Sequence, residues 1–197
     1  MTTSQIVICI VVAILVFWLV GAYNRLVRLR NALANAFAQI DVQLKRRYDL
    51  IPNLVDVARK YLEHERGTLE AVTAARNQAH AAADRARPHP GAPGDMASLA
   101  LAEQVLGGAM GRLMALVENY PELKADQSLR ELSEELTSTE NKVGFSRQLY
   151  NDSALDFNNA VQEFPTSMIS GIFGFRPVGM LQATQTDVER APVRVQL

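Results

Sequence analysis

The most prominent pattern in the chain is an apolar run near its start, from Ile6 to Tyr23. It holds 18 residues and no charge, and as an α-helix rising about 1.5 Å per residue it would extend roughly 27 Å, close to the hydrocarbon thickness of a bilayer. The pattern predicts a transmembrane helix over residues 6–23, with residues 1–5 as a short segment beyond the membrane.

A second pattern follows the apolar run without an intervening turn signal. Apolar or aromatic side chains recur at a mean spacing of 3.6 residues, which is the period of an α-helix. They are Leu26, Leu29, Leu33, Phe37, Ile40, Leu44, Tyr48, Ile51, Val55, Ala58 and Leu62. We therefore expect the membrane helix to continue directly into a long amphipathic rod.

Pro52 lies inside this second pattern. In a helix interior it removes the hydrogen bond to the Tyr48 carbonyl, at a cost of about 3 kcal/mol. Asp49 could cap a new helix that holds Pro52 in its first turn. Asp49 and Pro52 therefore mark a candidate break, with a second helix from Leu50 into the alanine-rich stretch 71–87 as the favoured arrangement and a kinked single helix as the alternative.

The clearest interruption of the chain is the Pro- and Gly-rich stretch 88–94, which predicts an exposed loop. Asp95 is a suitable N-cap for a further helix that ends before Pro121. Gly107, Gly108 and Gly111 weaken this helix, each by roughly 1 kcal/mol relative to Ala. Their ordinary explanation is close packing against a neighbouring helix, and the approach of a partner is the alternative.

A last helix is expected from about Asp126 to Phe164, where Pro165 ends it. Short connections between long amphipathic helices favour antiparallel neighbours. The predicted fold is all-α: a transmembrane helix that continues into an elongated antiparallel bundle of about four long helices over residues 24–165, which form one domain.

The remaining segment, residues 166–197, contains an apolar stretch broken by Gly and Pro. It is too short for a second span and carries Arg176. We expect Phe173 and Phe175 to cover the end of the bundle core, and docking to another subunit or to the membrane surface is the alternative.

Charge supplies one candidate interaction site and excludes one class of partner. The consecutive Lys45, Arg46 and Arg47 are either a solvated helix face or a contact for an acidic partner or a second copy. The net charge of −1 and the lack of a basic cluster interleaved with aromatics argue against nucleic-acid binding.

The sequence contains no recognisable catalytic, cofactor or metal motif. His64-Glu65 has Thr68 where a zinc-protease helix needs its second His. The glycines near Gly107 lack the Lys-Ser/Thr ending of a phosphate-binding loop. We therefore expect no enzyme activity, no cofactor and no bound metal.

The apolar run could also be a cleaved signal peptide, because Val20-Gly21-Ala22 resembles a cleavage site. The run is longer than a typical signal core, no Lys or Arg precedes it, and three arginines follow at once: Arg25, Arg28 and Arg30. Such residues tend to stay in the cytoplasm. We therefore expect a retained single-pass anchor in a bacterial inner membrane, with the N-terminus outside and the body cytoplasmic, and a periplasmic body as the alternative.

The segment 40–55, IDVQLKRRYDLIPNLV, closely resembles the signature of the LemA family. Further similarities are YNRLV at 23–27, RQLYND at 147–152 and FGF at 173–175. The resemblance implies a membrane-anchored bacterial protein with an antiparallel helical bundle and no established enzymatic activity. It also implies a link of some members to intracellular membrane structures, and many members carry a lipid-modified Cys where this chain has Ala22.

These patterns together favour a membrane-anchored scaffold that associates with itself. Its partners would be membrane lipid through residues 6–23 and other copies of the chain. An accessory subunit of another membrane protein, such as a protease, is the first alternative, and an enzyme of unknown type is the second.

Overall fold

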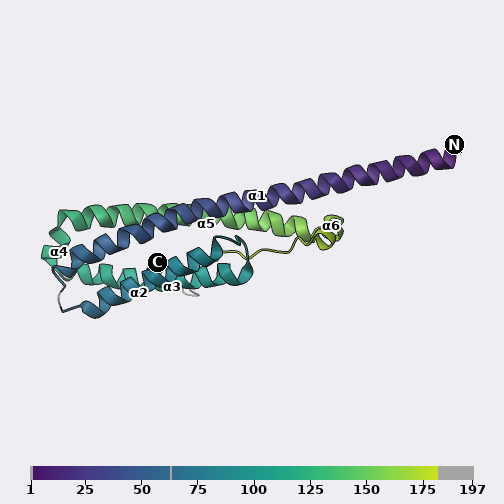
Figure 1. Cartoon of the computed structure of the whole chain (residues 1–197). Helices are drawn as coiled ribbons and strands as arrows, with labels where there is room; N and C mark the ends of the chain where they lie inside the picture. The colour runs from purple at the N-terminus through teal and green to yellow at the C-terminus, as the bar shows by residue number, and fades with distance from the viewer. Residues whose placement is uncertain (1, 63, 182–197) are drawn as a thin grey trace, which may run out of the picture.

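The computed structural model describes residues 2–62 and 64–181, and every regular element within them is a helix (Figure 1). The helices are α1 (Thr3–Arg59), α2 (Arg66–Ala86), α3 (Pro93–Val117), α4 (Pro121–Ala125), α5 (Gln127–Gln162) and α6 (Thr166–Phe173). The predicted all-α fold with four long helices is confirmed. Residues 182–197 of the predicted C-terminal tail lie outside the described residues.

The four long helices form an elongated bundle in which successive long helices run in opposite directions (Figure 1). α1 and α5 pack along each other, and the hairpin of α2 and α3 packs on α1 through α2. The short α4 connects α3 to α5 at one end of the bundle. The short α6 lies beside α1 at the other end, where the N-terminal part of α1 projects away from the bundle (Figure 1).

The predicted apolar stripe of α1 forms the centre of the core. Ten of its eleven members are buried, and Leu29 is half-buried. Each fully buried large aliphatic side chain contributes roughly 1.5–3 kcal/mol relative to an exposed one. In α2 the buried face consists largely of alanines, which let α3 approach closely: Ala75, Ala79, Ala82, Ala83 and Ala86.

The predicted helix break at Asp49 and Pro52 is wrong, because α1 is helical through Pro52 to Arg59. The chain instead turns between Arg59 and Arg66, so the expected continuous helix from Leu50 into the alanine-rich stretch is also wrong. The turn reverses the chain direction and thereby packs the alanine face of α2 back on α1.

The starts of the two later long helices differ in how well the sequence predicts them. Asp126 caps α5 as predicted, and its carboxylate accepts a hydrogen bond of 3.1 Å from the Leu129 amide. α3 begins earlier than predicted, with Ala92 as N-cap and Pro93 in the first turn, where its missing N–H costs little. Asp95 therefore lies inside the first turn, where its negative charge interacts favourably with the positive end of the helix dipole.

The projecting part of α1 consists of the apolar run identified in the sequence. Within residues 2–62 and 64–181, α1 and α3 are the two helices long and apolar enough to cross a membrane. They differ in their surroundings: the large side chains from Ile6 to Val20 are exposed, whereas α3 buries Met96, Leu99, Leu106 and Leu113 in the bundle. The apolar side chains of α1 in this stretch have no protein core to pack into.

The described part of the C-terminal segment, after α6, is an extended strap across the bundle. The side-chain amide of Asn158 bonds both the N–H and the C=O of Val178, at 2.7 and 3.0 Å. Asn151 does the same for Leu181, at 2.9 and 2.7 Å. The Gly179 amide donates to the Gly91 carbonyl at 2.8 Å, so the strap ties the α2–α3 loop to α5.

Candidate interaction site

The three residues of the basic cluster, Lys45, Arg46 and Arg47, differ in their burial. Lys45 and Arg46 are exposed, and Arg46 Nε donates to Glu135 of α5 at 3.1 Å. Arg47 is buried and pairs with Glu103 of α3 at 2.9 Å. Arg46 and Arg47 thus hold α1 to its neighbours within the chain, and Lys45 lies on the exposed surface of α1.

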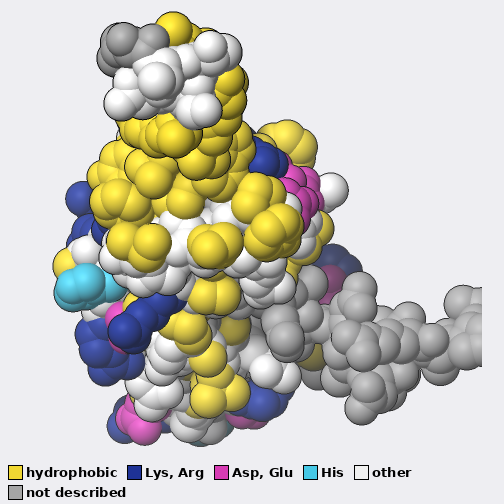
Figure 2. Space-filling view, turned by 90° about the vertical axis from the view of Figure 1, so that its right-hand side faces the viewer, with side chains coloured by type: hydrophobic (Ala, Val, Ile, Leu, Met, Phe, Trp, Pro, Cys, Tyr) yellow, Lys and Arg dark blue, Asp and Glu magenta, His cyan; other side chains and the backbone are white. Residues whose placement is uncertain are grey.

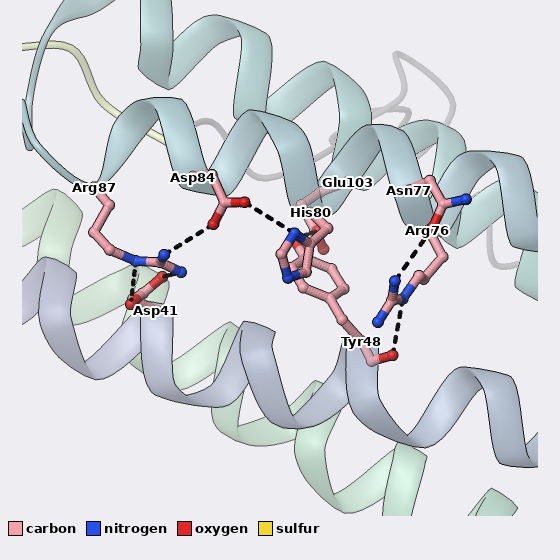
Figure 3. A network of polar contacts seen from close by, with 8 residues as sticks. All are labelled: Asp41, Tyr48, Arg76, Asn77, His80, Asp84, Arg87 and Glu103. Atoms are coloured by element: carbon pink, nitrogen blue, oxygen red, sulfur yellow. Dashed lines mark hydrogen bonds and ion pairs between the residues drawn. The ribbon is translucent and has the colours of Figure 1, made fainter.

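Arg47 belongs to a set of charged and hydrogen-bonding side chains between α1, α2 and α3, called the polar network below and shown in part in Figure 3. It comprises Asp41, Arg47 and Tyr48 of α1, Arg76, His80, Asp84 and Arg87 of α2, and Glu103 of α3. Every buried side-chain nitrogen or oxygen among the described residues has a hydrogen-bond partner. The network is therefore fully satisfied, which is the condition under which buried polar groups specify a unique packing.

The backbone at Pro52 is part of the same network. Pro52 has no N–H for the Tyr48 carbonyl, and Arg76 of α2 supplies the missing donor: its Nε lies 3.0 Å from the Tyr48 oxygen (Figure 3). A bond from a charged donor is stronger than a neutral one, so it offsets part of the cost of a proline within a helix. This contact explains why α1 does not break where the sequence alone predicts it.

Glu103 is the centre of the buried part of the network. One of its carboxylate oxygens accepts the Tyr48 hydroxyl, and the other accepts Arg47. Burial raises the pKa of the Glu103 carboxyl, and the Arg47 guanidinium opposes this shift. Burial, reinforced by the charge of Glu103, also raises the pKa of Tyr48. Tyr48 therefore stays protonated and donates to Glu103.

The outer edge of the network joins α1 to α2 through more exposed charges (Figure 3). Arg87 bonds both oxygens of Asp41 at 2.9 Å and also Asp84 at 2.8 Å. His80 lies 3.0 Å from Asp84, and its ring packs over Tyr48 with the ring centres 5.5 Å apart. Exposed pairs of this kind contribute little stability each, but they fix the register of α2 on α1.

Gly107, Gly108 and Gly111 do not pack closely against a neighbouring helix, so their ordinary explanation is wrong. A Cβ built at any of the three meets nothing within 4 Å. Gly108 and Gly111 are exposed, and Leu101 and Val105 on the same helix are exposed as well. This outer face of α3 combines exposed apolar side chains and open glycines with the exposed Arg112, and the residues that the structure describes leave it accessible.

Phe173 and Phe175 lie at the end of the bundle from which α1 projects. The Phe175 ring packs on Phe157 of α5, and its centre is 5.8 Å from that of Tyr23. The Phe173 ring is 4.9 Å from Tyr23 but remains half exposed. Phe175 thus covers the small cluster of Leu26, Phe157, Ala160, Val161 and Ile169.

The polar network holds α1, α2 and α3 together. Both oxygens of Glu103 are occupied by partners from within the chain. Over residues 2–62 and 64–181, no group of three or more His, Cys, Asp or Glu side chains has a geometry that could hold a metal ion.

Comparison with known proteins places this architecture in a family. The model of the LemA family matches residues 36–197. The chain belongs to the LemA family. The resemblance noted for the segment 40–55 is thereby confirmed, and it includes the part of α1 that carries Tyr48 and Pro52.

The relatives of the chain differ in how much of their length they share with it. Protein LemA of Metamycoplasma hominis is 27% identical over 183 residues, which cover 92% of this chain and 78% of that protein. Magnetosome protein MamQ of Magnetospirillum gryphiswaldense is 33% identical over 72 residues, 36% of this chain and 26% of that protein. Magnetosome protein MamQ 2 of Paramagnetospirillum magneticum is 31% identical over 70 residues, with the same shares.

The chain thus spans about a quarter of the length of the magnetosome relatives. Neither LemA nor MamQ is a name that denotes an enzyme. Family membership and the exposed apolar segment of α1 together indicate a membrane-associated helical protein.

Sequence reasoning missed two pairs of residues that hold the bundle together. Glu103 and Arg76 occupy ordinary polar positions of amphipathic helices, and nothing in their local sequence indicates burial or a carbonyl partner. Asn151 and Asn158 are seven residues apart, which places them on one face of α5, but their partners are backbone groups far along the chain. Only Pro52 offered a signal, because the carbonyl it leaves free requires a donor.

We predict that Arg76 and Pro52 are energetically coupled through the Tyr48 carbonyl. Replacing Arg76→Met should cost about 1.5–3 kcal/mol, the range for a hydrogen bond to a charged group. In a Pro52→Ala background the new amide at position 52 can bond the same carbonyl, so the cost of Arg76→Met should fall. Chemical unfolding in detergent micelles measures the free energy of unfolding of the unchanged protein, the two single variants and the double variant. The exposed Arg85→Met on the same helix is the control. An equal cost in both backgrounds would contradict the proposed pairing.

We also predict a pH dependence that arises from Glu103. Its pKa is raised in the folded state, so its contribution to stability is fully present below the ordinary value of 4.5 and is lost as pH rises through the raised pKa. Glu103→Gln cannot ionise, and its melting temperature should therefore fall less between pH 4.5 and neutrality than that of the unchanged protein. The exposed Glu131→Gln should retain the original slope, and an identical slope in all three proteins would refute the assignment.

Proposed function

We propose that this protein is a single-pass membrane scaffold whose helical body associates with further copies of itself. The observation that carries the proposal is the continuity of α1, which is one helix from Thr3 to Arg59 and contains both the exposed apolar segment and the buried stripe of the bundle core. A body joined to its anchor by unbroken helix begins at a fixed position along the helix axis, directly beyond the membrane. That property suits a scaffold.

The anchor in this proposal is the segment 6–23, with lipid as its first partner. Its exposed side chains need an apolar surrounding, and its length matches the roughly 30 Å hydrocarbon core of a bilayer. Arg25, Arg28 and Arg30 follow the segment and are all exposed. By the preference of such residues for the cytoplasmic side, the N-terminus lies outside and the bundle inside the cell.

The surface proposed for self-association is the outer face of α3. Leu101 is 64% exposed and Val105 is 44% exposed, and the open glycines continue the same face. The alanine-rich face of α2 is buried within the chain and is not available to a second copy. Confinement in a membrane raises the local concentration of the chains, so a modest contact area suffices.

The comparisons support this proposal through the names of two relatives. Two relatives are named as magnetosome proteins, and the LemA family model and the similarity to Protein LemA each cover most of the chain. A role in organising membranes or membrane proteins fits these names and the rod-like body. An accessory subunit of another membrane protein would share the anchor but would expose a face for a different partner.

We predict that a charge on the outer face of α3 weakens self-association. Leu101→Glu introduces a carboxylate that must lose its hydration in the contact, so the oligomer should dissociate to a monomer at protein concentrations where the unchanged chain remains assembled. Val42→Glu is the matched control, because Val42 lies on α1 with 63% of its surface exposed against 64% for Leu101. Light scattering of the detergent-extracted full chain measures the mass.

Three outcomes separate the alternatives. Loss of the oligomer in Leu101→Glu alone supports the proposed surface. Equal behaviour of both variants removes α3 from the contact. A monomeric unchanged chain that co-purifies with one membrane protein would reject self-association and favour the accessory-subunit role.

A further inference from the structure

The helix α6 has two apolar faces, and only one of them is used by the protein core. Ile169 and Ser170 are buried, and Ile169 belongs to the same buried cluster as Leu26 and Phe157. The opposite face is the most exposed apolar surface of the bundle end. Its members are Met168 at 64%, Ile172 at 76% and Phe173 at 50% exposure, and Phe164, in the turn just before α6, is 82% exposed.

The exposed face cannot be hidden by a simple rotation of α6. The Ser170 hydroxyl bonds the Val161 carbonyl of α5 at 2.9 Å. Gly174 then ends the helix in a left-handed conformation, with φ of 73°, from which the strap continues. α6 is therefore held from its buried side and from its C-terminal end, so the outward orientation of Met168 and Ile172 is built into the fold.

The position of α6 along α1 points to what covers this face. The Phe173 ring lies 4.9 Å from that of Tyr23, the last residue of the apolar segment 6–23. If this segment spans a bilayer, Tyr23 lies near the boundary between hydrocarbon and headgroups, and α6 lies at the same depth. Figure 2 looks onto this end of the molecule, and hydrophobic side chains continue from the projecting helix onto the bundle end.

Charges next to this surface lie where phosphate headgroups would be. Arg25 follows Tyr23 and lies 3.7 Å from Glu163, which precedes Phe164. Arg28, Arg30 and Arg176 are exposed on the same end of the bundle. Aromatic side chains at the boundary with basic residues just beyond it form the usual arrangement at the edge of a membrane.

We propose that the exposed face of α6, formed by Met168, Ile172 and Phe173, together with Phe164 in the turn before it, is a second membrane contact that inserts into the interface of the bilayer spanned by α1. The inference rests on the proposed membrane anchor and adds a second attachment point. A single helix leaves a rod free to spin about its axis and to tilt, whereas two contacts fix which side of the bundle faces the membrane. The strap after α6 then holds the α2–α3 loop in a defined orientation to the lipid.

Spin labels in the full-length protein test the proposal. The protein is reconstituted in vesicles of phosphatidylethanolamine and phosphatidylglycerol, and each label's access to oxygen, which concentrates in lipid, and to a water-soluble nickel chelate is measured. Cys9, the single cysteine, reports on the anchor itself. In a Cys9→Ser background, Ile172→Cys and Met168→Cys report on α6. Phe145→Cys on α5 is the control, since it is 72% exposed and distant from the anchor.

The expected result is several-fold less access to the nickel chelate at residues 168 and 172 than at residue 145, together with high access to oxygen. Nickel access at residues 168 and 172 equal to that at residue 145 would overturn the membrane contact. Low access to both reagents would overturn it in favour of coverage by a second copy. The label at Cys9 separates these failures from failure of the anchor, because it should be shielded from nickel whatever α6 does. Unchanged helix content and melting temperature show that each variant is folded.

Discussion

The structure depends on one constraint: a single continuous helix, α1, carries the exposed apolar segment and also forms the centre of the bundle core. The uncovered apolar stretch of α1 ends at Tyr23, and the part that is buried in the bundle begins at Leu26. The helix is unbroken between these two residues. On one side of this point apolar side chains face outward around the whole helix, and on the other side they face inward along one stripe. Because a helix satisfies all its backbone hydrogen bonds internally, it can make this change with no additional element. The proposed anchor, the proposed orientation of the body and the depth of α6 all follow from it.

The bundle is held in register by polar contacts at defined points along α1. Arg76 supplies the donor that Pro52 lacks, Glu103 binds Arg47 and Tyr48, and Arg87 binds Asp41. An alanine-rich interface between α2 and its neighbours is smooth and by itself specifies register weakly. The polar network compensates for this, since a helix displaced by one turn would leave buried charges unpaired, which is costly.

Much of the fold could be predicted from the sequence because it is determined by local periodicity. The stripe of α1 and the cap at Asp126 are properties of neighbouring residues, and the structure contains both; α5 ends at Gln162, two residues before the predicted end at Phe164, and Pro165 precedes the short α6. The continuity at Pro52 could not be predicted, because it depends on a donor 24 residues away in α2. The exposed position of Gly108 and the bonds of Asn158 to the strap are likewise tertiary facts that no local pattern contains.

The most direct test of this account is the distance between the anchor and the body of one chain in a bilayer. Spin labels at the native Cys9 and at Val42→Cys are 33 residues apart on α1, so an unbroken helix places them about 50 Å from each other at 1.5 Å per residue. Pulsed electron resonance of the full chain, diluted with unlabelled protein in lipid nanodiscs, should give one narrow distribution near this value. A broad distribution or a clearly shorter mean distance would show a hinge between anchor and bundle and would contradict the account.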